Sequence, residues 1–104
     1  MSDRYDDKPF LRYVDAWVLN AIGALDEPTR AYCVAMEPQL RQSLGKTGSW
    51  DAIVAQQMNF PPELPEQIRR IWADGQAKFE QANGRPADPV QFAMIFVDRN
   101  FGRA

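Results

Sequence analysis

The side chains that most enzymes use for acid–base and nucleophilic chemistry are scarce in this sequence. Its 104 residues include no histidine and a single cysteine, Cys33. The lack of histidine excludes Ser-His and Cys-His nucleophile pairs and the zinc sites that histidine helps to form. One cysteine is also too few for a four-cysteine structural zinc site. We therefore expect no catalytic residue, no metal and no cofactor.

Carboxylates remain as candidate acids and bases, and two of them lie beside apolar residues. Asp15 lies within an apolar segment near the N-terminus, and Asp98 follows the apolar run at positions 90–97. Apolar surroundings raise the pKa of a carboxyl group, as at many catalytic sites. Neither residue has an obvious second carboxylate beside it, whereas Arg12 and Arg99 are close in sequence. Ion pairing is therefore the favoured interpretation, above all for Asp98 near a helix C-terminus, where the dipole disfavours an anion.

The segment Leu44-Gly45-Lys46-Thr47 resembles the end of a phosphate-binding loop. That motif requires another glycine five residues before Gly45, where Leu40 stands, and a strand that leads into the loop. A helical pattern leads into this segment instead. We interpret it as a turn between helices, in which glycine supplies positive φ angles.

Charge is nearly balanced, with 12 Lys and Arg against 14 Asp and Glu and a net charge of −2. The basic pair Arg69 and Arg70 is interspersed with acidic residues such as Glu66 and Asp74, which does not favour nucleic-acid binding. No uncharged run approaches the ~18 residues of a membrane span, and the acidic N-terminus lacks the features of a signal peptide. With its lone cysteine in an apolar stretch, the sequence predicts a cytoplasmic protein that binds neither nucleic acid nor membrane.

Apolar residues recur at helical spacing along most of the chain, which predicts an all-α fold in a single domain over residues 9–104. Residues 1–8 are predicted to be a disordered acidic tail. About five helices are expected, over residues 9–25, 27–44, 50–58 and 64–83 and from residue 89 onward.

Capping residues and prolines mark where the predicted helices begin and bend. Asp26 and Asp88, each followed closely by proline, are suited to cap the second and fifth helices. Pro38 falls inside the second helix, where it removes one backbone hydrogen bond and crowds the preceding turn. The apolar face also rotates at this position, so we expect a kink or break at Pro38.

The fourth predicted helix carries one narrow apolar stripe, expected to face the core, with Gly75 at its centre. The stripe consists of Leu64, Ile68, Ile71, Trp72, Phe79 and Ala82. Glycine inside a helix costs roughly 1 kcal/mol relative to alanine. Its position on the apolar stripe therefore suggests that another helix crosses close to the backbone there.

Two helices have more apolar surface than one core-facing side requires. Seven of the eight residues at positions 90–97 are apolar, and Leu19 lies in the narrow polar side of the first helix. Either the last helix occupies the middle of the bundle, or its second face meets another chain. The leading hypothesis is a non-enzymatic protein-interaction module that uses Leu19, Phe92 and Phe96, with another protein or a second copy as partner.

The alternative hypothesis is a small-molecule-binding module or minor enzyme with an apolar pocket between the first and last helices. Trp17, Phe92 and Phe96 would line this pocket, and Asp15 or Asp98 would supply its polar group. An antitoxin- or immunity-type inhibitor also fits so small and slightly acidic a chain, although by composition only.

Overall fold

The computed structural model describes Tyr5 and residues 8–101, which form α-helices joined by turns, without a β-strand in this part of the chain. The predicted all-helical character is therefore confirmed. Most of the predicted tail, residues 1–8, lies outside the described residues. The described part has six helices rather than five: α1 (Leu11–Ala21), α2 (Glu27–Ala35), α3 (Glu37–Leu44), α4 (Trp50–Met58), α5 (Leu64–Asn83) and α6 (Pro89–Asn100).

Local side-chain bonds explain where two of the helices begin. The Asp26 carboxylate accepts a hydrogen bond of 3.1 Å from the backbone N–H of Thr29 at the start of α2. Asp88 accepts one of 2.9 Å from the N–H of Val90 at the start of α6. Both predicted caps are thus confirmed, because each carboxylate satisfies an N–H group that the first helical turn leaves unpaired.

The extra helix arises around Pro38. A kink or break was expected at Pro38 within one helix, and the structure has two helices that separate at Met36. Pro38 is the second residue of α3, in the first turn, where a missing N–H removes no helical hydrogen bond. The chain therefore breaks two residues before the proline.

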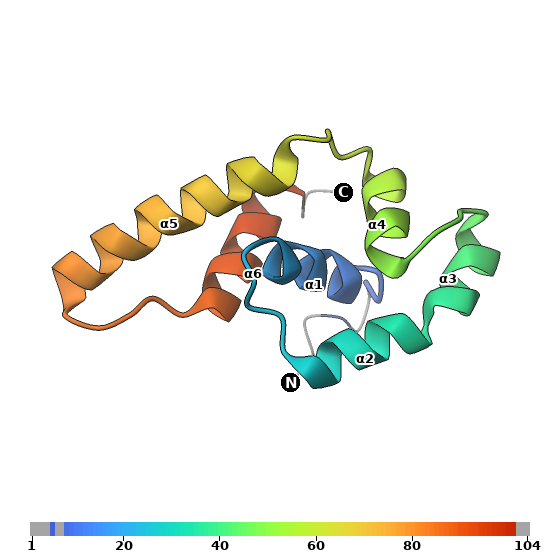
Figure 1. The fold of residues 1–104 in the computed structure, drawn as a ribbon, viewed down its shortest axis with the longest axis horizontal. Helices are drawn as coiled ribbons and strands as arrows, with labels where there is room; N and C mark the ends of the chain where they lie inside the picture. Colours follow the sequence, from blue (N-terminus) through green and yellow to red (C-terminus); the bar gives the residue numbers. More distant parts are fainter. Residues whose placement is uncertain (1–4, 6–7, 102–104) are drawn as a thin grey trace.

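The central element is α1, which contacts α2, α4, α5 and α6 (Figure 1). All seven residues at positions 13–19 are buried, including Val18 with no exposed surface. This helix, and not α6, occupies the middle of the fold. α1 ends at Ala21, before the predicted Leu25, because Gly23 turns the chain with a φ of 74°.

The C-terminal half of α5 projects beyond the other helices (Figure 1). Ile68 is the only residue of this 20-residue helix that is fully buried. The radius of gyration is 14.3 Å, above the ~13 Å typical of a compact domain of this length. We call residues 71–83 the α5 arm. None of the described helices combines the length and the apolar character that crossing a membrane requires.

Candidate functional site

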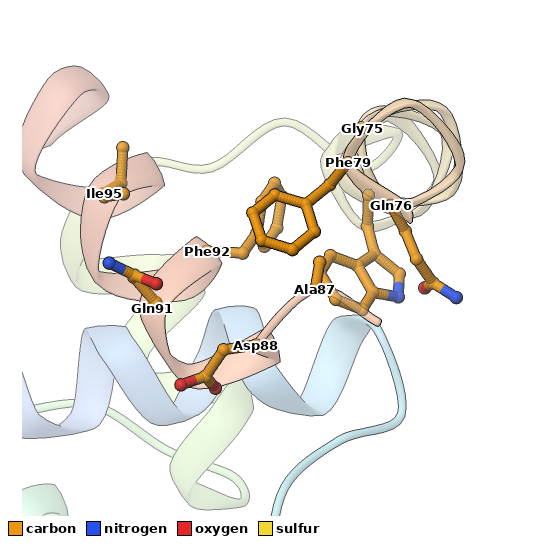
Figure 2. A pocket seen from close by; sticks show the side chains of 9 residues that line it. Gly75, Gln76, Phe79, Ala87, Asp88, Gln91, Phe92 and Ile95 are labelled. Carbon is orange, nitrogen blue, oxygen red and sulfur yellow. The ribbon is translucent and has the colours of Figure 1, made fainter. Parts of the chain in front are cut away.

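An apolar hollow lies between α5 and α6 and borders the α5 arm, and we call it the α5–α6 groove. One part has a volume of about 290 Å³, with walls from both helices and the segment that joins them (Figure 2). It is lined by Trp72, Gly75, Gln76, Phe79, Ala87, Asp88, Gln91, Phe92 and Ile95. An adjoining part, about 310 Å³, continues along α6 and is lined by Ile71, Phe92, Ile95, Phe96, Arg99 and Asn100.

Aromatic rings form the base of the groove. Trp72 of α5 and Phe92 of α6 lie with their ring centroids 5.1 Å apart, which is a favourable distance for a tilted pair. Phe96 continues the row at 5.9 Å from Phe92. Phe79 and Phe92 project into the space between the two helices from opposite sides (Figure 2). The contact between Trp72 and Phe92 links α5 to α6.

The same row of rings connects the groove with the core. Phe96 contacts Phe101, whose ring lies 4.8 Å from Phe60. Phe60 in turn packs at 4.5 Å against Trp17 of α1. The wall that α6 contributes is therefore anchored in the rigid centre of the fold.

Apolar side chains also remain exposed along the groove. Ile71 of α5 and Ile95 of α6 are each 49% exposed, although both line its second part. On α6, only Ala93 and Val97 are fully buried against the core. Part of the second face of α6 is thus exposed in the single chain.

The polar groups of the groove do not form an acid–base pair. Asp88 is the only carboxylate among the described residues that line it, and its side chain caps α6 and points away from the rings (Figure 2). Gln76 and Gln91 supply neutral amides at the edge. No group of three His, Cys, Asp or Glu side chains in the described part of the chain is arranged to hold a metal ion.

The predicted partner-binding residues are divided between the groove and the core. Phe92 and Phe96 are half-buried and line the groove. Leu19 is only 8% exposed and lies in the core beside other α1 residues. The structure therefore brings Phe92 and Phe96 together but does not place Leu19 on the same surface.

The residues of the alternative pocket are dispersed. Trp17 is 7% exposed, and its indole N–H donates a hydrogen bond of 3.1 Å to the backbone carbonyl of Asp51. Asp15 is 3% exposed and accepts a bond of 2.7 Å from the hydroxyl of Tyr5. Asp98 lies on the exposed side of α6. The hollow that Phe92 and Phe96 line is bounded by α5, and neither Trp17 nor Asp15 lines it.

Sequence reasoning missed the contribution of α5, since it assigned Ile71, Trp72 and Phe79 to the core stripe. The length of the fourth predicted helix was the feature of the sequence that could have indicated this contribution. It is the longest predicted helix, so its apolar stripe extends beyond the neighbouring helices that could cover it. Gly75 at the centre of that stripe pointed to a close helix crossing, and none of the described helices makes that crossing.

Two other motifs have structural roles in the single chain. Gly45 ends α3 with a φ of 64°, and the carbonyl of Gly48 accepts a hydrogen bond of 3.0 Å from the Arg41 guanidinium. The phosphate-loop-like segment is therefore the interhelical turn that we expected.

Cys33 is fully buried, and burial raises the pKa of its thiol to about 11. The reactive thiolate is consequently scarce at neutral pH.

Comparison with known proteins does not extend this description. No protein-family model matches the chain, and no curated protein or solved structure matches it either. The function must therefore be argued from the groove itself.

Proposed function

We propose that this chain is a non-enzymatic protein-interaction module that binds an apolar helix of a protein partner in the α5–α6 groove. The observation that carries the proposal is the exposure of Ile71 and Ile95 on the two helices that form one hollow. Both residues would lose contact with water if a third helix lay between α5 and α6. Recognition of an amphipathic helix by an apolar groove is a common mode of binding.

The composition of the groove supports this interpretation. Interfaces are rich in aromatic residues near their centre and have polar groups at their rim. Trp72, Phe92 and Phe96 lie at the centre of the groove, and Gln91 and Arg99 lie along α6 at its edge. Removing such apolar area from water contributes about 25 cal/mol per Å², so a few ring-sized contacts offset much of the cost of association.

The proposal includes a cytoplasmic location. Cys33 is a free thiol with no second cysteine available for a disulfide within the chain. Such cysteine usage is typical of proteins that work in a reducing compartment.

Small-molecule binding is the second candidate, because two amide side chains adjoin the aromatic wall of the first part of the groove. Gln76 and Gln91 would orient a ligand stacked against Trp72 or Phe92. The volume of about 290 Å³ is at the lower end of the range for ligand pockets. The second part of the groove favours a helix over a small ligand, because it extends the hollow along α6.

Site-specific photo-crosslinking in cells tests the proposed function. A photoreactive residue replaces Ile95 in the groove or, as a matched control, Val34 on α2, which is also 49% exposed. We expect covalent protein adducts, identified by mass spectrometry, at position 95 and not at position 34. Equal labelling at both positions, or no protein adduct at position 95, would contradict the proposal.

A further inference from the structure

We infer that the helix received by the groove is α5 of a second copy of this chain, which crosses the first α5 antiparallel at Gly75. This inference rests on the proposed function of the α5–α6 groove and identifies its partner. Each copy would place its arm against the groove of the other, so that the same surface is used twice. Such an interface closes after two subunits.

The α5 arm is itself a helix of the kind that the groove would bind. Ile71, Gly75 and Ala82 are all exposed. At 3.6 residues per turn they lie within about 40° of one another around the helix axis. The single chain therefore presents an exposed line of apolar and small residues on its longest helix, and two of them, Ile71 and Gly75, also line the groove.

The glycine at position 75 is a second observation that supports a helix crossing between two copies. A Cβ atom at this position would meet no other atom within 4 Å, so packing within the chain does not require glycine here. Glycine nevertheless costs the helix roughly 1 kcal/mol relative to alanine. A close crossing of two helix backbones explains the residue, since a side chain at the crossing point would hold the backbones apart.

Charges beside the apolar line determine the direction of the second helix. Lys78 and Asp74 lie about 60° and about 100° from Gly75 on one flank of α5. In an antiparallel pair centred on Gly75, the same flanks face each other, which places Lys78 of one copy about 3 Å along the axis from Asp74 of the other. The two Asp74 residues have the same axial offset, but at about 100° from the contact line they lie farther from each other than each lies from Lys78 of the other copy. A parallel pair would instead bring Lys78 beside the uncharged flank that contains Gln76. Charge complementarity therefore selects the antiparallel arrangement.

These charges already interact within one helix, where the Lys78 ammonium lies 3.1 Å from the Asp74 carboxylate. Both side chains are largely exposed, so the pair is free to become part of a four-charge network. The network would contain two lysines and two aspartates around the crossing point. Such an arrangement adds attraction between copies without breaking the pairs inside each helix.

The oligomeric state of the purified full-length chain tests the inference. Sedimentation equilibrium over a concentration series should show a reversible dimer. We expect Gly75→Leu to weaken the dimer by about tenfold or more, because a bulky side chain separates the backbones. The same change should make the isolated chain more resistant to heat, because leucine favours the helix and meets no neighbour.

Ala73→Leu is the matched control, because Ala73 is exposed about 160° away from Gly75 around the helix. This variant should dimerise like the wild type. A wild type that is monomeric at every concentration, or a Gly75→Leu dimer as tight as that of the wild type, would overturn the inference.

Charge reversal provides an independent measurement. Lys78→Glu should weaken the dimer by about fivefold, since it replaces attraction with repulsion at two symmetric exposed positions. The double variant Asp74→Lys/Lys78→Glu should restore wild-type affinity, because it exchanges the two signs. A double variant no tighter than the single one would show that these charges do not face each other.

Disulfide trapping tests the direction of crossing. Under oxidising conditions Gly75→Cys should link two copies, whereas Ala82→Cys should not, because antiparallel copies place these residues about 21 Å apart. Cys33 is buried and is not expected to compete. Linkage through both positions would indicate parallel helices and overturn the antiparallel model.

The two proposals fail in different ways. If the purified chain is monomeric but the residue at position 95 labels a different protein in cells, the dimer is excluded while the interaction function stands. If position 95 labels no protein and the chain is monomeric, both proposals are wrong.

Discussion

At the scale of single residues, side chains that could take part in chemistry are buried in the core. The Cys33 thiol is inaccessible, and burial holds its pKa well above the ordinary 9.0 of a cysteine. Asp15 is bound by the hydroxyl of Tyr5, and the indole of Trp17 is bound by a backbone carbonyl. These bonds satisfy polar atoms that would otherwise be costly to bury.

The raised pKa of Cys33 predicts how stability depends on alkaline pH. Folding raises the pKa from 9.0 to about 11, so between these values the folded chain keeps a proton that the unfolded chain has lost. The free energy of unfolding should therefore decrease as pH rises from about 9 through about 11. Tyr13, whose pKa burial also raises, contributes in the same direction.

Urea titrations at pH 8 and above measure this dependence, with Cys33→Ala as the comparison. The variant should lose less stability over this interval than the wild type, because only the Tyr13 contribution remains. Equal slopes for the two proteins would show that the thiol is not the titrating group. Rapid reaction of Cys33 with a disulfide reagent in the folded chain would likewise contradict its burial.

At the scale of elements, the fold depends on helices packed around α1, whereas part of the surface of α6 stays exposed. On α4, which packs against α1, Ile53 has no exposed surface. Ile95 of α6 is half exposed at the groove. Two chemically identical side chains thus occupy opposite kinds of environment.

Alanine substitution should separate these environments. Ile53→Ala should lower the free energy of unfolding by about 2–5 kcal/mol, because it removes buried methyl groups and leaves a cavity. Ile95→Ala should change the stability of the monomer by at most about 0.5 kcal/mol. Chemical denaturation of both variants at low protein concentration provides the measurement. A large loss from Ile95→Ala would place this residue in the core and remove support for the groove.

At the scale of the whole molecule, the projecting α5 arm makes the chain larger than its length requires. The radius of gyration of 14.3 Å reflects a helix that is packed at its N-terminal half and uncovered beyond it. Exposed apolar surface on a projecting helix is typical of a subunit that is completed by another chain.

Small-angle X-ray scattering of the Gly75→Leu variant, at a concentration at which sedimentation shows only monomer, tests this shape without the contribution of a dimer. We expect a monomer whose radius of gyration stays near 14 Å, above the ~13 Å of a compact domain. If the arm instead folds onto α6 in solution, the value will fall to that of the compact domain, and the groove will be absent.

Features that depend on near neighbours in the chain were predictable from the sequence. The helical spacing of apolar residues specified an all-α fold, and Asp26 and Asp88 marked two helix starts, because capping bonds span only two or three residues. The pairing of Phe92 and Phe96 on one face also follows from helical geometry, since residues four apart are neighbours.

Features that depend on contacts between distant segments were decided only by the tertiary structure. The sequence offers two helices that are apolar nearly all round, and only packing determines that α1 takes the centre and leaves one face of α6 uncovered. Packing likewise determines that Leu19 is buried and that the hollow beside Phe92 is closed by α5. The hydrophobic effect is non-directional and depends on the apolar area removed from water. The sequence therefore determines how much apolar surface each helix has, whereas the packing of the helices determines which surfaces contact each other.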